Sequence, residues 1–224
     1  MVQWSKFIFW RYIMVDRYTS FTDLAQQTTE WEDWSIHTEE RGAPHLITAI
    51  HGGAIERGTS EVAELIARRG GYDFYTFKAT RRNKNNELHV TSRHFNEPHL
   101  ETLVQGKRHV ISIHGCRGVK SKVYLGGLDH TLREHLTNAL ERRSFLVEAA
   151  PPPISGMHTD NFVNCGGRKK GVQIELTEPL RKQFFNNKKF NLHNREDESN
   201  WSPVMMAFAE AVLEAIDVMN KEEE

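Results

Sequence analysis

Cysteine is scarce in this chain, which contains only Cys116 and Cys165 among its 224 residues. A domain of this length can bury a large enough apolar core to fold without a disulfide. We therefore expect two free thiols, and we expect Cys116 to be buried.

Long apolar runs are also absent. No stretch approaches the roughly 20 consecutive apolar residues that span a bilayer. The first 14 residues are apolar but contain Lys6 and Arg11, and no small-residue cleavage site follows them, so we expect no signal peptide. These features predict a cytoplasmic protein without a membrane partner, which cell lysis would release. Because Met14 offers a second start, we treat residues 1–14 as an N-terminal extension and residues 15–224 as the folded domain.

Neither sign of charge is in excess, since the formal net charge is −1 at pH 7. A balanced charge gives no general attraction to nucleic acid or to an anionic surface. Hydrophobic residues make up 38% of the sequence, which is enough for one sizeable core. We therefore expect a monomeric globular protein that does not bind nucleic acid.

Apolar runs alternate with helical stretches along most of the chain. The pattern predicts strands at residues 45–50, 72–79, 87–91, 109–113, 123–127, 144–150 and 171–177. It predicts helices at residues 59–69, 96–106 and 128–143, and a long one from Ser202-Pro203 to the charged tail. Such alternation indicates a single-domain α/β fold whose sheet is covered on both faces. The first 40 residues are the least regular, and Trp31 and Trp34 are expected to pack on the body of the domain.

Two of the predicted strands end in histidine, and a third carries a carboxylate. His51 follows L-I-T-A-I, and His114 follows I-S-I. In V-Q-I-E-L the apolar residues point one way, so Glu175 points the other way and requires a partner or a cleft. Because ligands of open α/β sheets bind beyond the carboxyl ends of the strands, these three side chains are candidates for one site.

Two histidines and a carboxylate form the donor set of a catalytic zinc ion, which keeps one position open for water. Glu56 follows His51 by five residues, a spacing that excludes the helical H-E-x-x-H arrangement. The spacing fits a loop, in which Gly52 and Gly53 permit a tight turn. Zinc lowers the pKa of a bound water toward about 7, and Glu175 can serve as general base and later as proton donor.

Each of these residues also has a simpler explanation. A histidine at the end of a strand is more often a satisfied polar group than a ligand. Glu56 can be a solvated acid that favours a helix N-terminus, and Glu175 can be a buried ion-pair partner. Only the combination of H-G-G-x-x-E, I-H-G and Q-I-E-L favours a metal site.

The segments H-G-G-A-I-E-R-G-T-S-E, H-F-N-E-P, I-S-I-H-G-C-R-G and G-V-Q-I-E-L-T resemble, in order and spacing, the phage and bacillar poly-γ-glutamate hydrolase family. The resemblance spans about residues 15–220. It implies a compact relative of the carboxypeptidase-type zinc peptidases, a three-layer α/β/α fold with a mixed, twisted sheet. It also implies that His51, Glu56 and His114 bind zinc, that Glu175 is the catalytic carboxylate, and that the reaction is hydrolysis of γ-glutamyl amide bonds. The carboxypeptidases themselves have a shorter His-to-Glu spacing.

Basic loops fit an anionic polymer as substrate. Three clusters are expected on or near one face of the molecule: Arg81-Arg82-Lys84, Arg117-Lys120-Lys122 and Arg168-Lys169-Lys170. Arg117 follows His114 by three residues, so we expect it to bind a substrate carboxylate through two hydrogen bonds. His94 is a second expected substrate contact. Ordinary solvated surface is the simpler explanation for any single cluster.

Two other functions remain open. The same metal site would serve a zinc amidase or peptidase that acts on a small γ-glutamyl or N-acyl amino-acid substrate. Outside the enzymes, a non-catalytic module could bind an anionic polymer through the basic loops. Such binding would depend strongly on salt and would need no metal.

Overall fold

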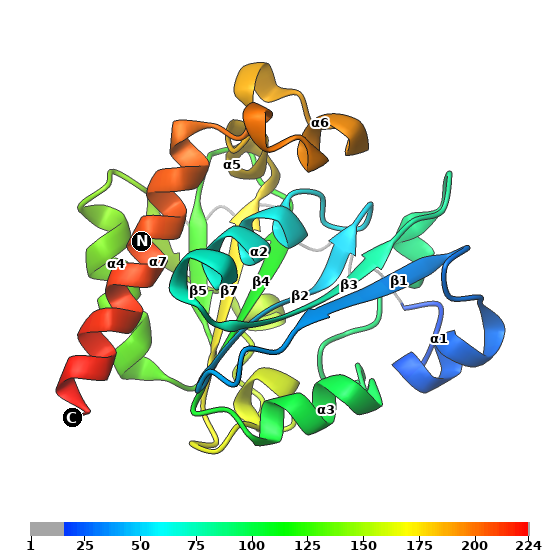
Figure 1. Cartoon of the computed structure of the whole chain (residues 1–224), viewed down its shortest axis with the longest axis horizontal. Helices are drawn as coiled ribbons and strands as arrows, with labels where there is room; N and C mark the ends of the chain where they lie inside the picture. The colour runs from blue at the N-terminus through cyan, green and yellow to red at the C-terminus, as the bar shows by residue number, and fades with distance from the viewer. Residues whose placement is uncertain (1–15, 224) are drawn as a thin grey trace, which may run out of the picture.

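One mixed sheet organises the computed structural model, which describes residues 16–223 (Figure 1). Seven strands form this sheet in the order β1-β3-β2-β4-β7-β5-β6. Their bounds are Trp34–Glu39 (β1), His45–Gly53 (β2), Asp73–Ala79 (β3), His109–Cys116 (β4), Val123–Gly126 (β5), Val147–Ala149 (β6) and Val172–Thr177 (β7). The four central strands are parallel, while β1 is antiparallel to β3 and β5 is antiparallel to β7. The predicted N-terminal extension and Met14 lie outside the described residues.

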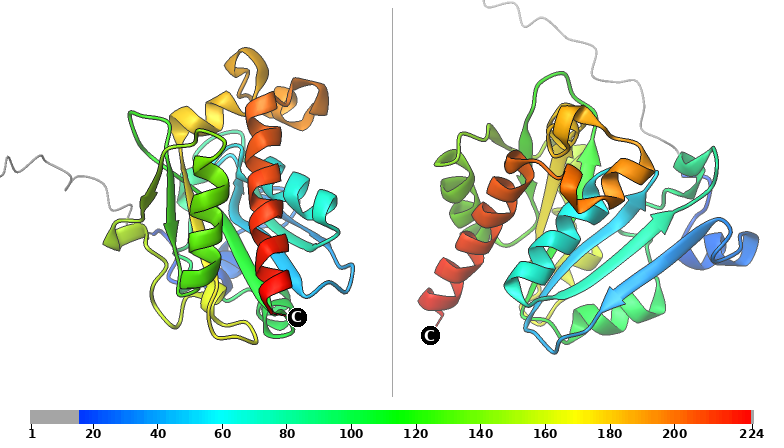
Figure 2. Two further views of the ribbon diagram at one scale, coloured as in Figure 1. Left: turned by 90° about the vertical axis from the view of Figure 1, so that its left-hand side faces the viewer. Right: turned by 45° about the horizontal axis from the view of Figure 1, so that its top comes forward.

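Helices cover both faces of this sheet. Their bounds are Phe21–Gln27 (α1), Thr59–Gly70 (α2), Pro98–Gln105 (α3), His130–Glu141 (α4), Glu178–Gln183 (α5), Leu192–Glu196 (α6) and Pro203–Glu222 (α7). One apolar core joins α2, α4 and α7 to one face, and a second joins α1 and α3 to the other. Helices α4 and α7 run beside each other on the first face (Figure 2). The α/β fold with a mixed sheet and helices on both faces is therefore confirmed, as one domain.

Local sequence signals explain most of these boundaries. Every residue of β2 is buried, as expected for a central parallel strand that is covered on both faces. Helix α3 begins with Pro98 in its first turn, and the side chain of Glu97 accepts hydrogen bonds from two backbone amides there. Helix α2 ends where Gly71 adopts the left-handed conformation at φ +65°. No helix among residues 16–223 is long and apolar enough to cross a membrane.

Some predictions were wrong. Residues 87–91 do not form a strand, because the chain makes a short 3₁₀ helix at Asn85–Leu88 and then runs on without a partner strand. Their alternation reflects the burial of Leu88 and Val90 in the core. Trp31 is 76% exposed and does not pack on the body, whereas Trp34 is buried at the start of β1. The predicted strand at 144–150 shrinks to β6, and β1, α1, α5 and α6 were not predicted.

Both cysteines are free, as predicted. Each thiol is half-buried, so Cys116 is more accessible than expected. Burial nevertheless raises the pKa of Cys116 to about 12, which keeps it protonated at neutral pH.

Candidate functional site

Parallel strands β2, β4 and β7 end at the same edge of the sheet, at the top of Figure 1. A cavity of about 640 Å³ lies at this edge. Its lining includes all four residues that the sequence singled out for metal binding and catalysis: His51, Glu56, His114 and Glu175. The tertiary structure therefore brings together residues that are up to 124 positions apart in the sequence (175 − 51).

A β-bulge in β2 directs His51 toward this cavity. Ala49 pairs with Thr76 of β3, but Gly52 pairs with Lys78, so two residues of β2 face one residue of β3. Ile50 packs in the same core cluster as Val90, and Nε2 of His51 lies 2.8 Å from the carbonyl oxygen of Val90. Strict alternation would have placed Ile50 and His51 on opposite faces, and the bulge places both on the side of Val90.

The loop after β2 brings Glu56 back to His51. The backbone amide of Glu56 donates to the carbonyl of His51 at 2.9 Å, which closes a tight turn through the two glycines. Oε1 of Glu56 lies 3.2 Å from Nδ1 of His51, and Oε2 accepts a hydrogen bond from the amide of Gly115 at 2.8 Å. Burial by itself would raise the pKa of Glu56, but the neighbouring His51 outweighs it and holds that pKa well below its usual range.

Strand β4 supplies the second histidine together with its support. Nε2 of His114 lies 2.8 Å from Oγ of Ser112, two residues earlier on the same face of the strand. Nδ1 of His114 lies 3.2 Å from Nδ1 of His51 and 3.7 Å from Oε2 of Glu56. Burial lowers the pKa of His114 to about 3, so its imidazole is neutral, as a metal ligand must be.

The donor set fits a zinc ion. Ligand atoms about 2.0–2.1 Å from a tetrahedral zinc are about 3.3 Å from one another. Nδ1 of His51 lies 3.2 Å from Nδ1 of His114 and 3.2 Å from Oε1 of Glu56, and the other carboxylate oxygen, Oε2, lies 3.7 Å from Nδ1 of His114. Each histidine also uses Nε2 for a second hydrogen bond, to the carbonyl of Val90 or the hydroxyl of Ser112, which leaves Nδ1 available. Among the described residues, these three form the one such group of histidine, cysteine and carboxylate side chains.

Strand β7 places a carboxylate next to this group. His114 pairs with Glu175 in the sheet, and Ser112 pairs with Gln173. The two strands thus carry matching polar pairs on the cavity face, because Nε2 of Gln173 donates to Oε1 of Glu175 at 3.0 Å. Burial and the negative charge of Glu56 raise the pKa of Glu175 well above its usual range. Glu175 can therefore take up and release a proton near neutral pH.

Of the two predicted substrate contacts, Arg117 lines the cavity and His94 does not. The side chain of His94 is exposed, and its backbone carbonyl accepts a hydrogen bond from the amide of Phe21 in α1. The preceding residue, Arg93, lines the cavity instead. The stretch H-F-N-E-P therefore lies near the site, but the side chain that reaches the cavity is the one just before it.

Two further residues of the lining were missed. His89 lies with its ring centroid 4.0 Å from that of His51, and its Nδ1 is 2.6 Å from Oδ1 of Asp16. Arg181 of α5 is buried and donates to the carbonyls of Leu176 and Arg57 at 3.1 and 2.6 Å. No spacing marked either residue, because each reaches the cavity through tertiary contacts.

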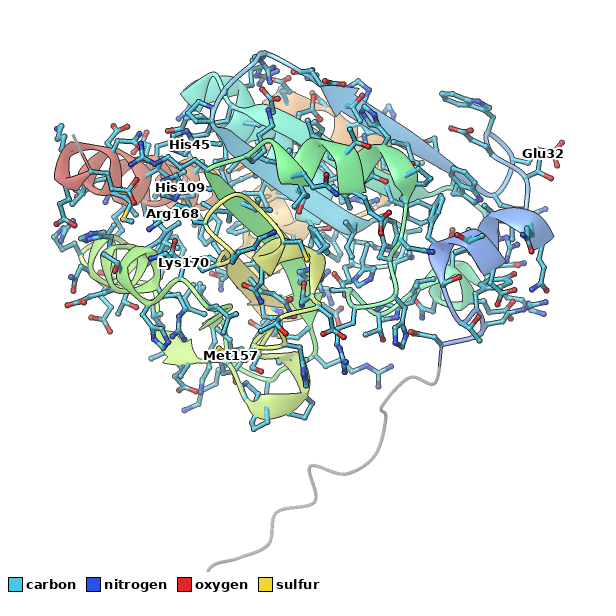
Figure 3. The ribbon with its side chains drawn as sticks, turned by 90° about the horizontal axis from the view of Figure 1, so that it is seen from below. Glu32, His45, His109, Met157, Arg168 and Lys170 are labelled. Atoms are coloured by element: carbon cyan, nitrogen blue, oxygen red, sulfur yellow. The ribbon has the colours of Figure 1, made fainter. Side chains whose placement is uncertain are left out.

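The basic cluster Arg168-Lys169-Lys170 was expected near the site but does not line the cavity. Nη1 of Arg168 is 2.8 Å from Nδ1 of His109, the first residue of β4, and 2.6 Å from Oδ2 of Asp129. This is the amino end of the strand that carries His114 at its other end. Figure 3 shows Arg168 and Lys170 grouped with His109 and His45 there. Arg81, from the first cluster, pairs with Asp33 and is not part of the cavity lining.

Comparisons with known proteins agree with this arrangement. Residues 18–211 match the family model described as poly-gamma-glutamate hydrolase. YmaC of Bacillus subtilis (strain 168) is 30% identical over 187 residues, which cover 83% of this chain and 78% of YmaC. A solved bacteriophage poly-gamma-glutamate hydrolase superposes with a TM-score of 0.88 at 27% identity, covering 94% of this chain and 100% of that one. The zinc-free apo structure of YndL superposes with a TM-score of 0.84 at 30% identity, covering 91% of this chain and 98% of YndL.

Proposed function

Because the chain belongs to the poly-γ-glutamate hydrolase family, we propose that it is a zinc-dependent enzyme that hydrolyses γ-glutamyl amide bonds within poly-γ-glutamate. One observation carries this proposal. Nδ1 of His51, Nδ1 of His114 and the carboxylate of Glu56 converge at zinc-ligand separations, in a cavity that also holds Glu175. The zinc-free form of the similar protein YndL supports the choice of metal.

His51, Glu56 and His114 would hold the ion. When bound, zinc supplies Lewis-acid chemistry, since it polarises a carbonyl oxygen and acidifies water. The backbone amide of Gly115 donates a hydrogen bond to Oε2 of Glu56 at 2.8 Å, which fixes the orientation of this carboxylate in the cavity wall. A pre-oriented ligand set of this kind costs little reorganisation when substrate binds.

Glu175 would carry the proton. Its carboxylate takes the proton of the attacking water as the oxygen bonds to the amide carbon. It then passes that proton to the leaving nitrogen as the C–N bond breaks, and a carboxylate and an amine result. Gln173 orients Glu175 for both transfers through the 3.0 Å hydrogen bond.

The cavity suits an anionic substrate. Arg93, Arg117 and Arg181 belong to its lining and come from three different segments. Poly-γ-glutamate carries one free α-carboxylate on each residue, so a bound segment presents several carboxylates at once.

The substitution Glu175→Gln tests the proposal. We expect the purified variant to keep one zinc ion per chain, because Glu175 is not a proposed ligand, and to lose polymer cleavage by at least about 100-fold. Zinc is measured by atomic absorption, and cleavage by the size distribution of a poly-γ-glutamate digest. Glu178→Gln, at another carboxylate of the same cavity, is the matched control and should retain most of the activity.

Three results would contradict the proposal. Equal cleavage by the Glu175→Gln variant would exclude Glu175 as the proton carrier. A wild-type protein that cleaves short γ-glutamyl peptides but leaves the polymer intact would favour the small-substrate amidase. Salt-dependent polymer binding without zinc and without cleavage would favour the binding module.

A further inference from the structure

An exposed ion pair lies at the wall of the cavity. Nε and Nη2 of Arg93 donate to Oδ1 and Oδ2 of Asp160 at 2.7 and 2.6 Å. Both nitrogens of the guanidinium fork thus bind both oxygens of one carboxylate. The side chains remain 39% and 55% exposed, so solvent reaches the pair.

The two partners come from the two segments that flank the proposed catalytic residues. Arg93 lies three residues after Val90, whose carbonyl oxygen is 2.8 Å from Nε2 of His51. Asp160 precedes Asn161, whose side chain donates to Gln173 at 3.0 Å, and Gln173 holds Glu175. The ion pair therefore connects the wall on the metal-ligand side to the wall on the Glu175 side.

The pair also lies where two cavities meet. Arg93 belongs to the lining of the 640 Å³ cavity and to that of a second cavity of about 230 Å³, which Asp160 also lines. Phe95 and Phe162 supply apolar surface in the second cavity. A polymer that extends beyond the main cavity in this direction must pass the Arg93 side chain.

A carboxylate of the substrate can replace that of Asp160 on Arg93 at a small cost in free energy. An exposed ion pair contributes little free energy, because water solvates both partners well when they separate. A substrate α-carboxylate has the same planar, two-oxygen geometry as the Asp160 side chain. A substrate held by its other contacts in the cavity can thus displace Asp160 from Arg93 at small cost.

We propose that Arg93 binds an α-carboxylate of the anionic substrate, one or more residues away from the cleaved amide, and that Asp160 occupies the same guanidinium fork when substrate is absent. This inference rests on the proposed function. It gives Arg93 and Asp160 opposite effects, because Arg93 attracts the substrate while Asp160 competes with it and repels it.

Kinetics on the zinc-loaded enzyme test the inference. We expect Arg93→Gln to raise KM for poly-γ-glutamate by roughly two- to fivefold and to change kcat little, since an exposed charged contact to substrate is lost away from the reacting atoms. We expect Asp160→Asn to lower KM. A polymer whose α-carboxylates are amidated should show neither effect.

The matched control is a second exposed pair of the same fork-to-fork geometry, formed by two residues that do not line the cavity. Arg68 donates to Glu198 at 2.7 and 2.8 Å, with side chains 45% and 56% exposed. Arg68→Gln and Glu198→Gln should leave KM unchanged, and thermal unfolding of all four variants should show that each is folded.

Polymer binding to the Glu175→Gln variant, measured by calorimetry, tests Arg93 without cleavage. Adding Arg93→Gln should weaken this binding by roughly two- to fivefold, and adding Asp160→Asn should strengthen it. If both Arg93→Gln and Asp160→Asn behave like the Arg68 and Glu198 controls while the wild type cleaves the polymer, the inference is wrong and the proposed function stands. A wild type that neither binds nor cleaves the polymer would overturn both.

Discussion

Each of the two proposed histidine ligands is oriented by a hydrogen bond from its second ring nitrogen. His51 and His114 each commit Nε2 to a neighbour, the carbonyl of Val90 and the hydroxyl of Ser112, at 2.8 Å in both cases. A carbonyl can only accept, so Nε2 of His51 carries a proton. For His114, the Ser112 hydroxyl can accept from Nε2 in the same way. Both histidines then present Nδ1 as the donor atom for a metal.

Loss of the Ser112 hydroxyl should therefore weaken zinc binding. We expect Ser112→Ala to lower zinc affinity by about tenfold, because the ring of His114 loses the bond that fixes its tautomer and orientation. Competition with a chromogenic chelator measures this affinity. Thr137→Ala, in α4, removes a hydroxyl that donates to the carbonyl of Arg133 and should leave zinc affinity unchanged. Equal affinities in both variants would show that Ser112 does not position His114.

At the scale of elements, the end of β2 is the part of the fold on which the site depends. Gly53 adopts a φ of +64°, and a Cβ atom there would lie 2.4 Å from the carbonyl oxygen of Ala79 in β3. The carbonyl of Gly53 also accepts a hydrogen bond from the buried Arg195 at 2.9 Å. Strand β3 on one side and the α6 segment on the other thus hold the turn between His51 and Glu56.

Substitution of Gly53 should damage both stability and metal binding. We expect Gly53→Ala to destabilise the fold by about 3 kcal/mol, through the left-handed backbone and the collision with Ala79, and to reduce zinc affinity. Gly42→Ala is the matched control, because Gly42 has a φ of +74° but a Cβ atom at this position would have no neighbour within 4 Å. The Gly42→Ala substitution should lower the free energy of unfolding by only about 1 kcal/mol. Urea unfolding measures both free energies. Equal losses of stability in the two variants would show that the contact with Ala79 is not what makes Gly53 necessary.

At the scale of the whole molecule, a second polar cluster connects the C-terminal end of α7 to the amino ends of β2 and β4. His109 at the start of β4 stacks on His45 with 5.0 Å between ring centroids. Arg168, Glu223 and Asp129 face its ring from the neighbouring segments, with Nε2 of His109 3.1 Å from Glu223. Burial, followed by the positive charge of Arg168, lowers the pKa of His109 to about 4.

This cluster predicts a loss of stability in mild acid. In the unfolded chain a histidine takes up its proton near pH 6.5, whereas folded His109 does so only near pH 4. Between these values the unfolded state binds more protons, so stability falls as pH falls. His109→Gln should reduce the drop in Tm between pH 6.5 and pH 4 by roughly 5–10 °C. His193→Gln, at an exposed position of α6, is the control, and an unchanged drop in both variants would exclude this role for His109.

Much of the architecture follows from local patterns in the sequence. Apolar runs predicted β2, β3, β4 and β7, and the Glu97-Pro98 and Ser202-Pro203 pairs marked where α3 and α7 begin. The segment 87–91 misled the prediction, because Leu88 and Val90 are buried by a chain that pairs with no strand. Alternating burial reports which side chains face the core, but it does not report whether another strand lies alongside.

The sequence by itself determined the fold class, because periodicity and helix caps act over a few residues, and it singled out His51, Glu56, His114 and Glu175 as a set. Only the tertiary structure decided which side chains reach the cavity. A one-residue bulge set the direction of His51, and the path of one loop placed Arg93 in the cavity instead of His94. The parallel strands separated Arg168 from the site, since the two ends of β4 lie at opposite edges of the sheet. Such placements depend on contacts between distant segments, which no local pattern records.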